Sequence, residues 1–203
     1  MVFEAARYLG ERWRDERSDA SVAFDEALGV QTARWTLAGY EPTPPEIFEA
    51  LMAALPTEAE GATFVDVGAG KGRVLLLAAR HPFARVLGLE LDPKLVDIAQ
   101  RNLRQASDPE RLVDDVSILH ADATTAPWPL EPLVVFLYNP FAGPALSQML
   151  DQLEASLEAH PRPCVIAYLN PLFLDLFMER GWSLAAEGGE DVACWAWVRA
   201  SRG

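Results

Sequence analysis

The sequence is poor in histidine and cysteine and has no long apolar run. Its 203 residues include three histidines, His81, His120 and His160, and their scattered positions lack the spacing of metal ligands, so no metal site is expected. The two cysteines, Cys164 and Cys194, lie inside apolar strand-like runs, which favours reduced core residues over a disulfide. No stretch approaches the roughly 20 consecutive apolar residues of a membrane span.

Positive charge is also scarce, because 17 lysines and arginines face 30 acidic residues for a net charge of −13. A surface of this sign repels nucleic acid in the absence of a local basic patch, which argues against a nucleic-acid partner. The N-terminus lacks the basic-then-apolar layout of a secretion signal. We therefore expect a cytoplasmic protein that needs neither metal nor membrane, while its oligomeric state stays open.

The informative feature that is present is the stretch 64–73, which reads FVDVGAGKGR. The apolar run Ala62–Val67 predicts a strand that is buried on both faces, and an apolar helix-like segment begins at Val74. Three glycines at alternate positions lie between them: Gly68, Gly70 and Gly72. Glycine allows a sharp turn and a close approach of a ligand to the backbone. A strand, a glycine-rich turn and a helix predict a nucleotide site at the carboxyl edge of a sheet.

Two acids decide which nucleotide fits this turn. Glu90 ends a second apolar strand twenty residues past Gly70, where a carboxylate can accept hydrogen bonds from both ribose hydroxyls. A dinucleotide motif would need glycine at position 73, but this chain has Arg73. Asp66 immediately precedes the turn, and its carboxylate would repel a pyrophosphate. These details disfavour the alternative of an NAD-type dinucleotide-binding oxidoreductase.

The spacing Asp66-x-Gly68-x-Gly70-x-Gly72 resembles the first motif of the class I S-adenosylmethionine-dependent methyltransferases. In that family the acid lies near the methionine end of the cofactor, which carries an ammonium and a sulfonium. The resemblance implies S-adenosyl-L-methionine as the cofactor. It assigns cofactor contacts to these residues of the first two strand ends: Asp66, Gly68, Ala69, Gly70, Gly72, Glu90 and Leu91.

Strand-like and helix-like segments alternate along the rest of the chain. Helices are expected after Asp92-Pro93, around Leu146–Leu157 and over 172–179. Further strands are expected at 116–119, 133–138 and 164–169, and a final hairpin joins 181–186 to 192–198 through 187–190. This order resembles the three-layer, Rossmann-like, seven-stranded α/β sheet of the class I family, which is mostly parallel and whose last strand is antiparallel. We expect a single domain, 1–203, with a helical N-terminal cap at 1–40 and a cofactor-binding core at 41–203.

The segment Tyr40–Glu46 precedes the glycine turn and has two compatible interpretations. Thr43 and Glu46 have the spacing of a capping box, with Pro44 in the first helical turn. The segment also resembles a Tyr-x-Pro-Thr-Pro element of one methyltransferase branch, the non-SET histone lysine and small protein-lysine enzymes. That resemblance implies that Tyr40 and Thr43 close over the methionine half of the cofactor.

Asp122 follows the third strand, and the resemblance implies that Asp122 and Ala123 contact the adenine. The alternative is an aspartate that only stabilises a turn or caps a helix. Lys71 and Arg73 fail the P-loop pattern, which predicts side chains that are either solvated or paired with acids.

Asn139-Pro140-Phe141 ends the fourth strand, where class I enzymes place the methyl acceptor. The triplet resembles the Asp/Asn-Pro-Pro-Tyr/Phe loop of nitrogen methyltransferases but is one residue shorter. It implies catalytic roles for these three residues, cofactor contact for Asn139, and an amine acceptor such as a protein lysine or a small molecule. The sequence predicts no general base. A methyltransferase-like binding module without activity is the second alternative, because activity would be lost in this shortened loop.

Overall fold

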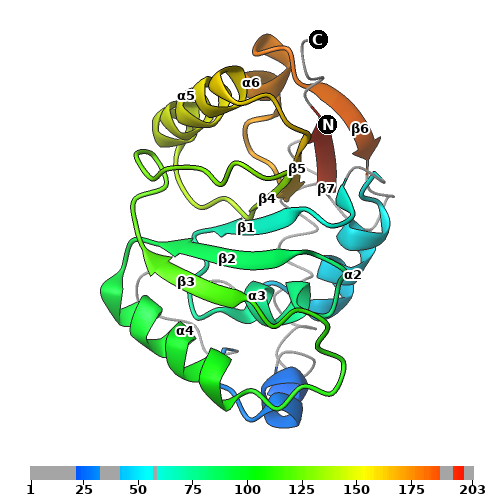
Figure 1. Cartoon of the computed structure of the whole chain (residues 1–203), viewed down its shortest axis with the longest axis vertical. Coiled ribbons are helices and arrows are strands. Elements are labelled where there is room, and N and C mark those ends of the chain that lie inside the picture. Colours follow the sequence, from blue (N-terminus) through cyan, green and yellow to red (C-terminus); the bar gives the residue numbers. More distant parts are fainter. Residues whose placement is uncertain (1–21, 33–41, 57–58, 188–193, 199–203) are drawn as a thin grey trace.

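The computed structural model describes residues 22–32, 42–56, 59–187 and 194–198, which form one sheet with helices on both faces (Figure 1). The strands are β1 Thr63–Val67, β2 Arg85–Glu90, β3 Val116–His120, β4 Leu133–Leu137, β5 Cys164–Leu169, β6 Ser183–Glu187 and β7 Cys194–Val198. Their order across the sheet is β3-β2-β1-β4-β5-β7-β6. The first five strands are parallel, which confirms the predicted Rossmann-like α/β fold.

At the far edge of the sheet, β7 pairs antiparallel with both β5 and β6. Residues 188–193, which join β6 to β7, lie outside the described part of the chain. The turn that the sequence predicts at 187–190 therefore falls almost wholly there.

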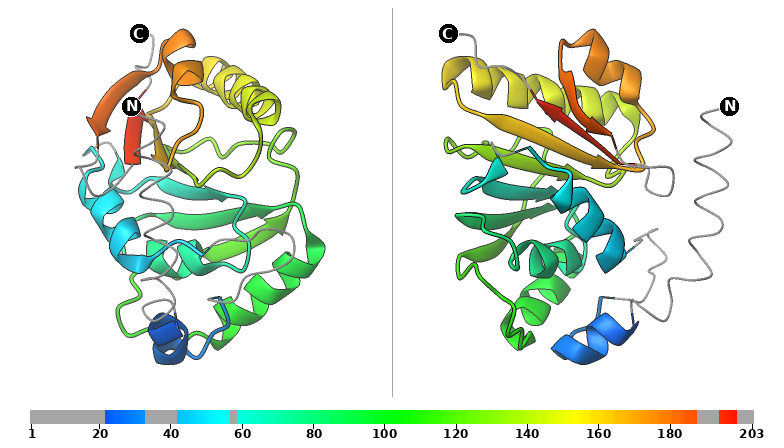
Figure 2. Two further views of the ribbon diagram at one scale, coloured as in Figure 1. Left: turned by 180° about the vertical axis from the view of Figure 1, so that it is seen from behind. Right: turned by 90° about the vertical axis from the view of Figure 1, so that its right-hand side faces the viewer.

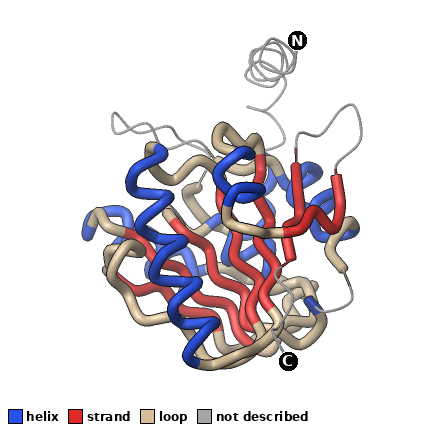
Figure 3. Tube along the Cα trace, turned by 90° about the horizontal axis from the view of Figure 1, so that it is seen from above, coloured by secondary structure: helices blue, strands red, loops and turns tan. Residues whose placement is uncertain are grey.

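The helices are α2 Pro45–Ala53, α3 Arg73–Ala78, α4 Pro93–Gln105, α5 Gly143–Ala159 and α6 Leu174–Glu179. Helices α2, α3 and α4 cover one face of the sheet, and α5 and α6 cover the other (Figures 2 and 3). Residues 22–28 form a further short helix, which packs beside α3 and α4. Of the expected N-terminal cap at 1–40, only 22–32 belong to the described residues.

The side chains of the central strands point alternately into two separate hydrophobic cores, one on each face of the sheet. On the α2–α4 side, Phe64 of β1 packs with Phe136 of β4 and Phe48 of α2, with ring centroids 6.1 and 5.9 Å from Phe64. On the α5–α6 side, Val65 and Val67 face the apolar stripe of α5. Burial on both faces explains why the central strands read as continuous apolar runs.

The predicted capping box at Thr43 and Glu46 is wrong. Helix α2 begins one residue later than that motif requires, with extended Pro44 at the N-cap and Pro45 as its first residue, and no side chain caps it. Pro44 at the N-cap has no side-chain oxygen that could accept from the amides of the first turn. In contrast, the predicted cap of α4 is confirmed, because the Asp92 side chain accepts a hydrogen bond from the amide of Lys94.

Within the described residues, Cys164 is buried and belongs to no disulfide, as expected for a core cysteine. No helix in that part of the chain is both long and apolar enough to cross a membrane. Over the same residues, no cluster of three or more histidine, cysteine or acidic side chains is arranged to hold a metal ion.

Candidate active site

A cavity of about 360 Å³ opens at the carboxyl ends of the parallel strands, the edge at which open α/β sheets bind ligands. Its volume lies in the range of small-molecule sites. The loops after β1 to β5 all contribute to its wall, together with Thr43 before α2 and the start of α3. Twelve of the residues predicted from sequence line it: Thr43, Asp66, Gly68, Ala69, Gly70, Glu90, Leu91, Asp122, Ala123, Asn139, Pro140 and Phe141.

Two predicted cofactor residues are not in the cavity wall. Tyr40 lies outside the described residues. Gly72 is not among the lining residues, and instead it lies against α4, where an added Cβ would come within 3.2 Å of the Ala99 Cβ. Its left-handed backbone, with φ of 81°, marks the entry into α3. The structure therefore gives Gly72 a role in packing the helix rather than in lining the cavity.

The backbone amides of the glycine turn donate hydrogen bonds to other groups of the protein. The amides of Gly68 and Ala69 both donate to the carbonyl oxygen of Leu89, at 2.8 and 3.1 Å. The amide of Gly70 donates to Glu90 Oε2 at 2.8 Å, and that of Gly72 donates to the Ala69 carbonyl at 2.9 Å. A turn that binds phosphate aims such amides at the anion. Here these four are already satisfied.

Gly68 lies where the glycine turn meets the loop 139–141. Its φ of +78° lies in the left-handed region, and an added Cβ would lie 3.0 Å from the Pro140 Cβ. Gly88 of β2 is equally constrained, since a Cβ there would lie 2.8 Å from the Ala69 Cβ. Sequence reasoning missed Gly88, because an isolated glycine in a strand does not indicate which other segment packs closely against it.

Asp66 is the buried acid of the site, with 3% of its surface exposed. In the sheet it lies between Gly88 of β2 and Phe136 of β4, so no neighbouring strand supplies a polar side chain in register. Burial, and secondarily the negative charge of Glu90, raises the pKa of the Asp66 carboxyl well above its ordinary 3.8. A cationic group in the cavity would reverse this effect by stabilising the carboxylate.

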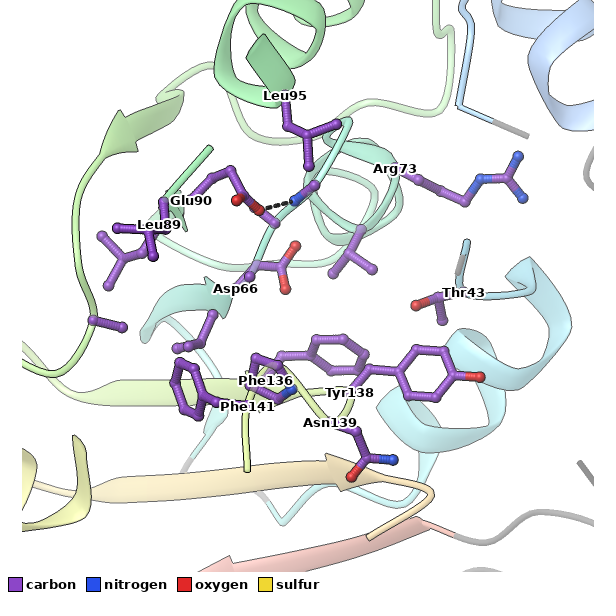
Figure 4. A pocket seen from close by; sticks show the side chains of 18 of the residues that line it. Thr43, Asp66, Arg73, Leu89, Glu90, Leu95, Phe136, Tyr138, Asn139 and Phe141 are labelled. Atoms are coloured by element: carbon purple, nitrogen blue, oxygen red, sulfur yellow. Dashed lines mark hydrogen bonds between the residues drawn. The ribbon is translucent and has the colours of Figure 1, made fainter. Parts of the chain in front are cut away.

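Glu90 is held in place by two backbone amides. Its Oε2 accepts from the amide of Gly70 at 2.8 Å, the dashed line in Figure 4, and its Oε1 accepts from the amide of Asp92 at 2.9 Å. Each carboxylate oxygen has a second lone pair, so these bonds leave acceptor capacity for ligand hydroxyls. The same carboxylate thus orders the glycine turn and faces the cavity.

Asp122 has the turn-stabilising role that was one of its two interpretations, and it also lies in the cavity wall. Its Oδ1 accepts from the amide and hydroxyl of Thr124 at 2.9 and 2.7 Å, so it stabilises a turn. These bonds lower the pKa of the Asp122 carboxyl, which is exposed and therefore ionised near neutral pH. Asp122 also lines the cavity beside buried Ala123, where a ligand amino group can meet it.

Asn139 adopts a left-handed backbone, with φ of 44°, at the end of β4. Its side-chain amide nitrogen donates to the carbonyl of Asn170 at 2.6 Å, and its Oδ1 accepts from the hydroxyl of Tyr168 at 3.0 Å. Figure 4 shows the side chain directed away from the centre of the cavity. Both side-chain hydrogen-bonding atoms therefore anchor the loop to β5.

Sequence reasoning missed several residues in the wall, namely Val67, Arg73, Val74, Leu89, Leu95, Ala121, Phe136, Tyr138 and Asn170. Phe136 and Tyr138 form an aromatic floor opposite Asp66 (Figure 4), and as part of an apolar strand they carried no signal of their own. Asn170 follows β5 as Asn139 follows β4, and it too has a positive φ, of 48°. An asparagine directly after an apolar strand was the signal that could have located it.

Residues 64–159 match the model of a family described as "Methyltransferase domain". Among solved structures, magnesium protoporphyrin IX methyltransferase from Synechocystis PCC 6803 is similar, with 16% identity, a TM-score of 0.53, and coverage of 76% of this chain and 77% of that one. Ribosomal protein L11 methylase from Lactobacillus delbrueckii subsp. bulgaricus has 13% identity, a TM-score of 0.51 and 77% coverage of both chains. A TehB-like methyltransferase from Corynebacterium glutamicum has 19% identity and a TM-score of 0.51 over the full length of both.

The search of curated proteins found no match. At these identities the likeness to solved structures establishes the fold, while the domain match covers the strands and loops that build most of the cavity. Both comparisons agree with the resemblance of the glycine motif to that of the class I S-adenosylmethionine-dependent methyltransferases.

Proposed function

We propose that this protein transfers the methyl group of S-adenosylmethionine to a nitrogen acceptor, a protein lysine or a small-molecule amine. The observation that carries the cofactor part is the combination of satisfied amides and two carboxylates at the glycine turn. Asp66 and Glu90 give the cavity a negative potential, which suits an ammonium and a sulfonium and opposes a diphosphate. This combination favours the methyltransferase over the dinucleotide oxidoreductase.

The proposed orientation of the cofactor follows from the order of polar groups along the cavity. Glu90 would bind the ribose hydroxyls, and Asp122 the adenine amino group beside Ala123 and Leu91. Asp66 would face the methionine ammonium. Thr43 is 3% exposed and, with no helix cap to occupy it, directs its hydroxyl toward the same end of the cavity (Figure 4).

The acceptor would bind beside the loop 139–141, where Phe141 and the aromatic floor exclude water. When bound, the cofactor would supply an electrophilic methyl group. The acceptor lone pair would bond to that carbon in line with the carbon–sulfur bond, which would break to leave S-adenosylhomocysteine, and the methylated amine would release a proton to solvent. Because the side-chain amide of Asn139 is hydrogen-bonded to Tyr168 of β5 and to Asn170 directly after it, we assign acceptor orientation to the backbone carbonyls of this loop. Aromatic walls lower the pKa of an adjacent amine by desolvation, which favours its reactive neutral form.

Two measurements test this function. In calorimetry, S-adenosylhomocysteine should bind and NAD should not, and binding of NAD alone would overturn the cofactor assignment. In the second measurement, the purified protein and S-adenosylmethionine are incubated with two lysate fractions, one depleted of small molecules and the other depleted of proteins. Methylated products in each fraction are then sought by mass spectrometry. New methyl-lysine or methylamine products support the acceptor class. Binding without any methylated product supports the alternative of a binding module without activity.

A further inference from the structure

The start of α3 carries an arginine that the proposed chemistry does not use. Arg73 lines the cavity, yet only 1% of its side chain is exposed. Its Nε donates to the hydroxyl of Thr32 at 2.7 Å, and a terminal nitrogen lies 3.2 Å from Asp25 Oδ1. The guanidinium also lies over the ring of Phe24, 5.0 Å from its centroid. Thus a residue of the glycine turn is bound by three residues that precede it by more than forty positions.

Asp25 and Thr32 are themselves fixed to each other. The Thr32 amide donates to Asp25 Oδ2 at 2.6 Å, and the Thr32 hydroxyl donates to Asp25 Oδ1. The hydroxyl of Thr32 therefore accepts from Arg73 and donates to Asp25 at once. Asp25 and Thr32 therefore hold each other in the positions in which they bind Arg73. We call residues 22–32 the N-terminal segment.

A second connection reaches the same turn through α4. The side chain of Asn102 is 2% exposed and donates from Nδ2 to the Lys71 carbonyl at 2.9 Å. Its Oδ1 accepts from the amide of Gln31 at 3.1 Å. Asn102 thus joins the N-terminal segment to the residue two positions before Arg73.

We propose that the N-terminal segment is part of the cofactor site, and that Asp25 and Thr32 are positioning residues that act on it through Arg73. The inference rests on the proposed cofactor. Residues Gly68, Gly70 and Gly72 all have positive φ, so the turn has little intrinsic preference for its binding shape. Glu90 fixes its middle, while Arg73 and Asn102 fix its end. A turn held at both places loses less entropy when the cofactor binds, which increases affinity.

The same helix offers a matched control. Arg80, just beyond the C-terminal end of α3, also lies over the Phe24 ring, at 5.6 Å, and pairs with Asp108 at 2.8 Å and with the more exposed Glu110 at 2.9 Å. The Asp108 side chain is 3% exposed, and that of Asp25 is 14% exposed. Asp108→Asn therefore removes a carboxylate of similar burial from an arginine that does not touch the glycine turn.

The experiment compares Asp25→Asn, Thr32→Val and Asp108→Asn with the unaltered protein, using calorimetry with S-adenosylhomocysteine and thermal unfolding. Both aspartate variants should lower Tm, because each removes a carboxylate that pairs with an arginine of low exposure. Only Asp25→Asn should also weaken binding by the folded protein, by about tenfold or more, with a smaller loss for Thr32→Val, which retains the ion pair. Turnover at saturating cofactor should change less than the KM for S-adenosylmethionine.

Equal affinities for Asp25→Asn, Thr32→Val and the unaltered protein would overturn the inference and leave the cofactor assignment intact. Equal losses in Asp25→Asn and Asp108→Asn would also overturn it, because they would indicate a general effect of destabilisation. If Asp25→Asn fails to fold, Thr32→Val alone decides the question. If the unaltered protein does not bind S-adenosylhomocysteine, the proposed function itself fails.

Discussion

Replacing Asp66 with asparagine should make the ligand-free protein more stable and the cofactor complex weaker. In the folded chain, burial and Glu90 raise the pKa of the Asp66 carboxyl above 3.8. Between its unfolded and folded pKa values, the unfolded chain has lost this proton while the folded chain still holds it. Stability therefore falls as pH rises through that window, and this loss persists at neutral pH. Asparagine has nearly the same shape and no charge, so it removes the loss.

The two effects can be bounded from the structure. Each unit by which the pKa is raised corresponds to about 1.4 kcal/mol, or about 3–6 °C in Tm for a chain of this size. An ammonium at about 4 Å from the carboxylate gains about 4 kcal/mol at an effective dielectric constant of about 20. The desolvation of both groups offsets part of that gain. We expect Asp66→Asn to weaken S-adenosylhomocysteine binding by between about tenfold and a thousandfold.

The assay is calorimetry across a range of pH, combined with thermal unfolding at neutral pH. In the unaltered protein, affinity should rise as pH rises toward the raised pKa of Asp66 and level off above it, because the cation binds the carboxylate form. Titrations in buffers of different ionisation enthalpy should show proton release on binding in this pH range, and Asp66→Asn should abolish it. Unchanged affinity in Asp66→Asn, or a lower Tm, would refute the reasoning.

Three further predictions test other parts of the site. Glu90→Gln should weaken S-adenosylhomocysteine binding by about tenfold or more in calorimetry, since it removes a charged hydrogen-bond acceptor that also orders the turn; unchanged binding would contradict the assignment of the ribose. Gly68→Ala should lower Tm by roughly 2–8 °C, because it adds left-handed strain and a close contact with the Cβ of Pro140. Gly181→Ala, with φ of +77° and open space around it, should cost less, and equal losses would show that only the φ matters. Tyr168→Phe removes the hydroxyl that anchors Asn139, so kcat should fall severalfold with little change in cofactor affinity, as it should in Asn139→Ala, and an unaltered kcat would remove this network from the mechanism.

The Asn139 network shows where a short motif is informative and where it is incomplete. The sequence predicted that the loop after β4 lines the cavity, and it does. It did not predict that the asparagine side chain turns toward β5, because this depends on where Tyr168 and Asn170 lie in space. Burial of the Tyr168 hydroxyl raises its pKa to about 12, so it remains a neutral donor to Asn139 across the physiological range.

The sequence by itself determined the order of strands and helices, the position of the glycine turn and the two acids beside it. These features are local, because apolar periodicity, glycine spacing and an acid at a strand end are each read within about twenty residues. The tertiary structure decided which groups remain available for a ligand. The amides of residues 68–70 donate to the Leu89 carbonyl and the Glu90 carboxylate, so they are not available to a ligand. Thr43 does not cap α2, and Arg73 pairs with Asp25, which lies forty-eight positions away in the sequence. Such contacts depend on the packing of distant segments against one sheet edge, which a local pattern cannot encode.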